Sequence, residues 1–334
     1  PSNIDMAKFK AEFLQQHYDT HGIPLRSKLV AFLPRINRIG MFFRPITNAL
    51  TEIQAFKKLI GFEPKRSIPK LSPQTLKKWL SKQNSASKNT GRKVYLFADE
   101  FTNYNESHIG IKAIMLLNKL GYEVVIPHHM ESGRTYLSKG LLRKSKEIAE
   151  ANVRHLSEII SEGTPLIGLE PSTILSFRDE YPELVDLKLQ EEARALAKNA
   201  LLLEEFFAAE IEKGNITPEQ FSEEKKIIKL HGHCQQKAIA STLPTKKMLG
   251  LPVNYSVEEI KSGCCGMAGS FGYEKEHYEL SVQIGELSVF PAVRKATDDE
   301  IITAPGTSCR HHIQDGTGRK VLHPVEVLWD AILK

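Results

Sequence analysis

Cysteine is absent from the first 233 residues of this 334-residue chain. The chain also lacks any run of about 18 apolar residues, the length that a membrane-spanning helix requires. The excess of positive charge is small, with 45 Lys and Arg against 40 Asp and Glu, so nucleic acid is not expected as a partner. The first residues show neither the basic start nor the apolar run of a secretory signal, and we expect a cytoplasmic location.

Several familiar catalytic and nucleotide-binding motifs are missing as well. The sequence contains no P-loop, no strand-coupled Gly-x-Gly-x-x-Gly and no Ser, His and Asp in the order of a known triad. We therefore do not expect this chain to bind a nucleotide by itself. Its chemistry has to come from other residues.

All four cysteines lie between positions 234 and 309, and this clustering needs a local explanation. In a large cytoplasmic chain, cysteines act more often as metal ligands or reactive thiols than as a disulfide framework. Two of them are adjacent, with Cα atoms about 3.8 Å apart, whereas an unstrained disulfide spans about 5.5 Å. The leading interpretation is a metal site with thiolate ligands from Cys234, Cys264, Cys265 and Cys309.

Short β-rich runs alternate with helical patterns from residue 91 onward, and the same order of elements starts again near residue 225. Strands are expected over residues 93–98, 122–126, 165–169, 227–230, 252–257 and 300–304. We predict an α/β fold of two pseudo-symmetric three-layer domains with parallel sheets. The first domain is expected over 91–185 and the second over 225–334, with a helical connector over 186–224 and one long helix over 277–296.

Residues 1–90 show helical and basic patterns, and prolines at 24, 34, 45 and 64 divide them into short helices. Most apolar stripes of such helices face a core, so the leading interpretation is a helical linker segment packed on its own domain. Contact of this basic, amphipathic stretch with a membrane surface or a partner is the alternative.

Each cysteine follows an expected strand or lies in a glycine-rich loop. The carboxyl ends of parallel strands meet at one edge of a sheet, so thiolates from three loops can converge there. Gly263, Gly266 and Gly269 allow the backbone to fold tightly around a cofactor, and His233 and His312 flank the cysteines. Soft thiolate ligands favour an iron-sulfur cluster or zinc, and unligated thiols remain an alternative.

The spacing of these cysteines resembles the cysteine-rich CCG domain of heterodisulfide reductase subunits and glycolate oxidase iron-sulfur subunits. The resemblance rests on Cys234, the run Cys264-Cys265-Gly266, and Cys309, and residues 263–272 are most similar to the version fused to FAD-linked oxidases. It implies a 4Fe-4S cluster, cubane or noncubane, held by the four cysteines. The family motif often ends in Cys-x-x-Cys, whereas this chain has His312 at the last position.

The first half of the α/β region resembles the same domain with its ligands replaced. Residues 97–102, 131–134 and 170–173 align with the three ligand loops of that domain. We expect that this copy has lost its own cluster. Its charged residues either face the thiolates of the second copy or are solvated loop charges, and they are Glu100, Glu131, Arg134 and Glu170.

Residues 1–10 resemble the segment that follows the last cysteine of a bacterial ferredoxin module. The resemblance therefore implies a longer parent protein with FAD-binding and ferredoxin-like domains upstream, where the FAD would be held. It predicts an iron-sulfur electron-transfer module of an FAD-linked oxidoreductase that acts on a small 2-hydroxy acid such as D-lactate or glycolate. The electron acceptor would be a quinone or another redox protein. A zinc-binding or metal-free interaction module, and thiol-disulfide catalysis as in heterodisulfide reductase, are the alternatives.

Overall fold

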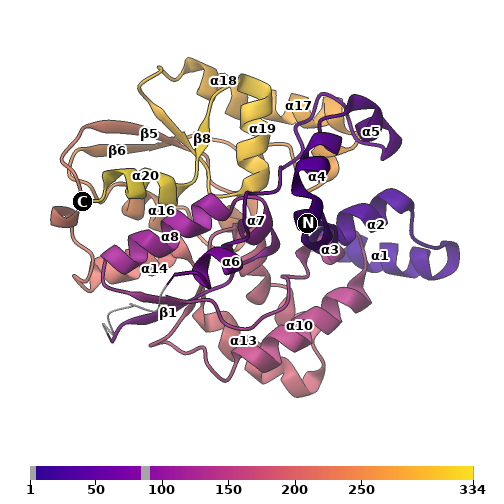
Figure 1. Ribbon diagram of the computed structural model, residues 1–334, viewed down its shortest axis with the longest axis horizontal. Coiled ribbons are helices and arrows are strands. Elements are labelled where there is room, and N and C mark those ends of the chain that lie inside the picture. Colours follow the sequence, from indigo (N-terminus) through magenta and orange to yellow (C-terminus); the bar gives the residue numbers. More distant parts are fainter. Residues whose placement is uncertain (1–4, 84–90, 334) are drawn as a thin grey trace.

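The protein contains two parallel β-sheets that repeat one topology (Figure 1). The computed structural model describes residues 5–83 and 91–333. Each sheet has four strands, in the orders β2-β1-β3-β4 and β6-β5-β7-β8. The strands are β1 (Lys93–Leu96), β2 (Glu123–Val125), β3 (Leu166–Gly168), β4 (Ala200–Leu202), β5 (Lys226–Leu230), β6 (Tyr255–Glu259), β7 (Ile301–Thr303) and β8 (Val321–Leu322). The predicted α/β fold with two parallel-sheet domains and a helical amino-terminal segment is confirmed.

Helices precede the first sheet and then flank both sheets. Those before the first strand are α1 (Met6–His21), α2 (Leu25–Ala31), α3 (Leu33–Gly40), η1 (Met41–Phe43), α4 (Arg44–Leu50), α5 (Gln54–Leu59) and α6 (Leu76–Leu80). Those of the first sheet are α7 (Glu100–Tyr104), α8 (Ser107–Lys119), α9 (Arg134–Ser138), α10 (Leu142–Leu156), α11 (Pro171–Ile174), η2 (Leu175–Phe177), α12 (Tyr181–Leu184), η3 (Leu187–Leu189), α13 (Gln190–Asn199) and α14 (Leu203–Glu212). Those of the second sheet are η4 (Pro218–Gln220), α15 (Cys234–Ile239), α16 (Leu243–Leu249), η5 (Phe271–Tyr273), α17 (Tyr278–Glu286), α18 (Val289–Lys295), α19 (Thr307–Thr317) and α20 (Pro324–Ala331).

The fourth strand of each sheet is where the sequence-based expectation fails. Residues 186–224 were expected to be wholly helical, yet they supply β4, and β8 lies beyond the strand expected to be last. These strands are only three and two residues long, too short to show a period of two. The Leu-rich run at 200–203 also fits a helix equally well by propensity. The division of the chain into domains at these boundaries stays a prediction.

The helix expected over 277–296 is broken into α17 and α18. The break falls at Leu287 and Ser288, where Ser288 adopts φ −156° and ψ −45°, outside the helical region. The apolar spacing on either side is helical, and the short interruption does not alter the pattern enough to be seen in the sequence.

One hydrophobic cluster runs through both halves of the molecule. It includes Leu116 and Phe206 from the first half and Met248 and Leu328 from the second. Figure 1 shows the helices that carry these residues, α8, α14, α16 and α20, between the two sheets. Burial of apolar surface is the main stabilising contribution in a protein core. The two halves therefore share one core, and loops of one half can contact loops of the other.

Two parts of the sequence-based interpretation lie partly outside the described residues. The ferredoxin-like resemblance begins within residues 1–4, and the expected boundary at residue 90 falls in 84–90. Among the helices that the structure describes, none combines the length and apolar character needed to cross a bilayer.

Candidate metal centre

The four cysteines lie at the carboxyl end of the second sheet. Cys234 is the first residue of α15, shortly after β5, and Cys264 and Cys265 lie in the loop that follows β6. Cys309 is in the first turn of α19, after β7. Because β5, β6 and β7 are parallel neighbours, their carboxyl ends share one edge, which brings the three loops together.

The thiols form a continuous series of contacts that runs from the surface inward. Cys234 is exposed, Cys264 half-buried, and Cys265 and Cys309 buried. Cys234 and Cys265 both lie next to Cys264, and Cys265 also lies next to Cys309. The residues predicted as ligands are thus neighbours in space.

These contacts shift the pKa values of the thiols in opposite directions. The pKa of Cys264 is held far below its ordinary value because Cys234, Cys265 and the backbone N–H of Gly266, at 3.3 Å, stabilise its thiolate. The contact with Cys264 raises the pKa of Cys234. The neighbouring Cys265 lowers the pKa of Cys309. Four adjacent thiolates repel one another, so full ionisation of the set requires a cation among them.

His231 is the imidazole that joins this group. Donor atoms of His231, Cys265 and Cys309 all lie within 4.8 Å of one another, and all three residues are buried. The Nδ1 atom of His231 is 2.9 Å from Oγ of Ser262, while Nε2 has no hydrogen-bond partner among the described residues. A buried nitrogen without a partner is costly unless something else binds it. His231 was not among the ligands first chosen from the sequence, although its position in the run His231-Gly-His-Cys234 is a signal.

The two histidines predicted to line the cofactor are engaged in hydrogen bonds within the fold. Nδ1 of His233 accepts a hydrogen bond of 3.2 Å from the backbone N–H of Gln235 and caps α15. Nε2 of His312 donates to the backbone carbonyl of Ser281 at 3.1 Å. Burial lowers the pKa of His312 to about 4, so this ring is neutral at ordinary pH. Their roles toward a cofactor stay predictions.

Gly266 is required by the close approach of a neighbouring helix. Its φ is +108°, and a Cβ added there would lie 2.3 Å from the backbone oxygen of Ser281 and 3.0 Å from Nε2 of His312. Gly263 and Gly269 have open space at the same position, and Gly269 has a φ of +65°. Of the three predicted glycines, Gly266 is the one at which an added Cβ would clash with neighbouring atoms.

Two carboxylates of the first half hold the helix that carries Cys309. Glu170 Oε2 accepts a hydrogen bond of 2.7 Å from the backbone N–H of Thr307, the first residue of α19. Glu106 Oε2 accepts from Oγ1 of the same threonine and pairs with Arg310 at 2.6 Å. A carboxylate at a helix amino terminus is favoured by the free N–H groups there. Glu106 and Arg310 carry no motif, so sequence reasoning missed them.

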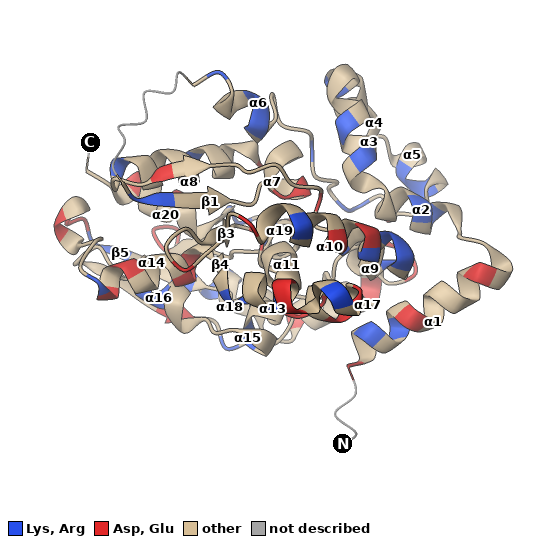
Figure 2. Cartoon of the chain, turned by 90° about the horizontal axis from the view of Figure 1, so that it is seen from below, with Lys and Arg blue, Asp and Glu red and all other residues tan. Residues whose placement is uncertain are grey.

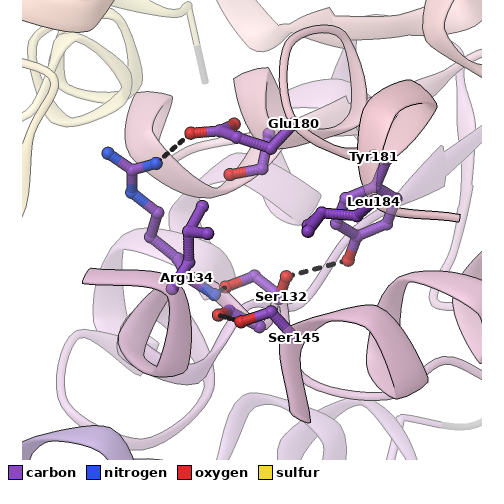
Figure 3. Close-up of a pocket in the computed structure, with 9 residues that line it drawn as sticks. Ser132, Arg134, Ser145, Glu180, Tyr181 and Leu184 are labelled. Atoms are coloured by element: carbon purple, nitrogen blue, oxygen red, sulfur yellow. Dashed lines mark hydrogen bonds and ion pairs between the residues drawn. The ribbon is translucent and has the colours of Figure 1, made fainter. Parts of the chain in front are cut away.

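The other charged residues considered in these loops bond within the first half. Glu100 accepts hydrogen bonds from Ser132. Arg134 pairs with Glu180, as Figure 3 shows. Glu131 accepts a hydrogen bond of 3.2 Å from the hydroxyl of Tyr136. Of the four residues considered at the sequence level, Glu170 therefore contacts the cysteine-bearing half directly. Arg134 lines a small pocket of the first half, and Glu100 bonds to Ser132, which lines the same pocket.

The donor set suits a thiolate-bound metal group. Four sulfurs from three loops, an imidazole with an unpaired buried nitrogen and a backbone N–H directed at one sulfur are features of iron-sulfur and zinc sites. The residues present thus fit either group.

Comparison with known proteins relates the chain to oxidoreductases. It is 28% identical to D-2-hydroxyglutarate dehydrogenase of Escherichia coli (strain K12), over 99% of this chain and 33% of that protein. The identity to the enzyme of the same name from Pantoea ananatis is 29%, again over 99% of this chain and 33% of the relative. One of the subunits of the anaerobic glycerol-3-phosphate dehydrogenase of E. coli K12 is 25% identical over 94% of this chain and 79% of its own length.

The chain thus spans about a third of the length of the two D-2-hydroxyglutarate dehydrogenases. No family model matches the sequence, and no solved structure matches it either. All three relatives are dehydrogenases or parts of one by name, which supports an oxidoreductase-related role for this chain.

Proposed function

We propose that this chain is the iron-sulfur-binding electron-transfer module of an FAD-linked oxidoreductase. The observation that carries the proposal is the buried group of His231, Cys265 and Cys309, whose donor atoms lie within 4.8 Å of one another, with Cys264 and Cys234 next to it. The ligands would be Cys234, Cys264, Cys265 and Cys309, with His231 as a further donor. A bound 4Fe-4S cluster would supply a site that accepts and releases one electron at a time.

The protein residues around such a site hold and tune it. Cys265 and Cys309 are 3% and 2% exposed, so this side of the site is shielded from water. The N–H of Gly266 points at the sulfur of Cys264, and hydrogen bonds of this kind stabilise the more negative, reduced state. The exposed side, at Cys234, is where an electron donor or acceptor could approach.

The substrate belongs to the whole protein rather than to this chain. The names of the relatives include a dehydrogenase of D-2-hydroxyglutarate, which agrees with the 2-hydroxy acid class implied by the CCG resemblance. We propose a D-2-hydroxy acid as the substrate of the parent enzyme, oxidised at an FAD domain. Ferredoxin-like clusters would lead electrons to this module, and a quinone or redox protein would receive them.

Metal analysis after anaerobic reconstitution of the full-length protein tests the proposal. We expect that Cys265→Ser lowers iron and acid-labile sulfide by the content of one cluster, with loss of part of the visible absorption. Ser138→Ala, a change of similar size in the first half, is the control and should keep the wild-type content. Equal iron and sulfide in Cys265→Ser and wild type would contradict the proposal.

Zinc is the second candidate, because three cysteines and one histidine form a common structural zinc set. The group of His231, Cys265 and Cys309, with Cys264 beside them, matches that composition. One zinc per chain that is lost in Cys265→Ser, without iron or sulfide at this site, would establish this alternative. Metal-free protein with a redox-active cysteine pair would instead support thiol-disulfide catalysis.

A further inference from the structure

The surface formed by α3, η1 and α4 carries its apolar residues outward. Its large apolar side chains follow each other at intervals of three and four, at positions 36, 39, 43, 46, 50 and 53, and all are exposed. Ile39, Phe43 and Ile46 are 60%, 62% and 61% exposed, and neighbouring Phe42 is 81% exposed. Such spacing is that of one face of a helix, and here it continues from α3 through η1 and α4 to Ile53. We call this set the apolar stripe.

The face opposite the apolar stripe is polar or small, and it packs against the protein. Asn37 donates to Asn105 at 3.0 Å, and Asn48 forms two hydrogen bonds with the backbone of Leu71. A Cβ added at Gly40 would meet Leu71 at 3.0 Å. A surface helix ordinarily turns its apolar face to the core and its polar face to water. The orientation of the apolar stripe is reversed, although other residues of the same segment, Tyr18 and Ala31, pack with Tyr136 of the first half. That the whole segment 1–90 is a linker packed on its own domain stays a prediction.

Positive charge predominates around the apolar stripe, and Glu52, near its end, pairs with Lys70. Residues 21–51 contain Arg26, Lys28, Arg35, Arg38 and Arg44 and no Asp or Glu. Arg26 pairs with Glu274 and Glu276, but no acidic side chain of the described residues forms an ion pair with the other four. In Figure 2, α3 and α4 stand away from the sheets and carry blue without red.

We propose that the apolar stripe and its flanking cations bind the surface of an anionic membrane. Exposed apolar side chains bordered by Lys and Arg are the signature of a helix that lies in the interface, with its apolar face about 5–10 Å into the headgroup region. A second copy of the chain docked through the same stripe would bring the same cations to this surface, because residues 21–51 contain no Asp or Glu. Anionic lipid headgroups supply the opposite charge and fit the exposed apolar stripe. Membrane binding through the apolar stripe does not depend on which metal the cysteines hold, because lipid binding requires no metal.

Sedimentation of the full-length protein with vesicles tests this surface. We expect binding to vesicles that contain phosphatidylglycerol, and little binding to pure phosphatidylcholine. Raising the salt from 0.1 to 1 M shortens the Debye length from about 10 to about 3 Å and should release most of the protein. Arg35→Gln and Arg38→Gln should each lower the partition coefficient about fivefold, the equivalent of about 1 kcal/mol per cation.

Apolar variants with a matched control complete the test. The triple variant Ile39→Ser, Phe43→Ser, Ile46→Ser should lose vesicle binding, whereas Leu187→Ser, Leu243→Ser, Val253→Ser, at exposed positions elsewhere, should bind as wild type does. Loss of binding in both triple variants, or absence of wild-type binding at low salt, would overturn the proposal. A third outcome would also overturn it: the wild type is a dimer in gel filtration, the stripe variant is a monomer, and neither protein binds vesicles. The stripe would then be a contact between two copies of the chain. Metal content is read on the same samples, so failure of the metal proposal and failure of this one are separable.

Discussion

Glu106 and Arg310 form an ion pair of 2.6 Å across the two halves of the molecule, with side chains only 13% and 7% exposed. Glu106 immediately precedes α8, next to the first sheet, and Arg310 follows Cys309 in α19. The arginine also donates to the backbone oxygens of Ala304 and Pro305, in the loop that enters α19. The pair therefore ties the position of the Cys309 helix to the half that has no cysteines.

Removal of Glu106 should destabilise the fold and disturb the metal site. Glu106→Gln removes the ion-pair partner of the buried Arg310, and breaking a buried pair costs about 3–5 kcal/mol of unfolding free energy. Chemical denaturation measures this loss, and reconstitution should show reduced metal per folded chain. Glu162→Gln, at an exposed position, is the control and should change stability by less than about 0.5 kcal/mol. Equal unfolding free energies of Glu106→Gln and Glu162→Gln would show that the ion pair of Glu106 and Arg310 does not stabilise the fold.

Gly266→Ala should be much more harmful than Gly263→Ala. The new Cβ at 266 would lie 2.3 Å from the backbone oxygen of Ser281, at a φ of +108°, whereas position 263 has open space. Strain of this kind costs of the order of 1–3 kcal/mol, and the shifted loop would move Cys264 and Cys265. The melting temperature and metal content of both variants provide the measurement. If both variants have the metal content and the melting temperature of the wild type, position 266 does not require glycine for its close contact with Ser281.

His231→Gln should weaken metal binding while the fold persists. The substitution keeps a polar side chain that can bond to Ser262 but removes the imidazole Nε2 beside Cys265 and Cys309. We expect a loss of at least about tenfold in metal affinity, by competition with a chelator, since even indirect partners of a metal contribute that much. His155→Gln, at an exposed position, is the control. An unchanged affinity in His231→Gln would exclude this histidine from the ligand set.

His323 should make stability fall in mild acid. Burial, with the nearby charge of Arg310, lowers the pKa of His323 to about 3, and its ring bonds to Leu169 and Val325 while neutral. In the unfolded chain the pKa is about 6.5, so the unfolded state binds more protons between these values. The contribution of His323 is thus complete above about pH 6.5 and is lost by about 1.4 kcal/mol per unit as pH falls toward 3.

The variant His323→Asn keeps an acceptor for the N–H of Val325 but cannot be protonated in this range. The difference between wild type and variant in unfolding free energy, measured by denaturation from pH 7 to pH 4, should therefore narrow as the pH falls. Parallel curves for the two proteins would show that His323 is protonated in the fold as easily as in the unfolded chain.

Local patterns were enough to predict the repeated sheet and the position of the cysteine loops at strand ends. β1 and β5 are short β-rich runs followed by helical patterns, and the three cysteine loops follow strands whose ends share an edge. β4 and β8 could not be predicted, because two or three residues show no period. Glu106 and Arg310 lie 204 positions apart, and no spacing rule joins such a pair.

Whether the apolar stripe faces the core or the solvent could not be predicted from the sequence either. The spacing of Ile39, Phe43 and Ile46 predicts a helix with one apolar face, but periodicity does not say whether a core lies on that side. The answer came from the opposite face, where Asn37 and Asn48 find their hydrogen-bond partners in the protein. Tertiary packing decides which side of a helix is buried, and the helical period alone does not give this information.

The hydrophobic cluster that unites α8 and α14 with α16 and α20 makes the two halves depend on each other for folding. Each half covers apolar side chains of the other, such as Phe206 of the first half and Met248 of the second. Cutting the chain between the halves would expose these side chains to water, so we expect neither half to be stable alone. The same cut would separate Glu106 and Glu170 from the helix that carries Cys309.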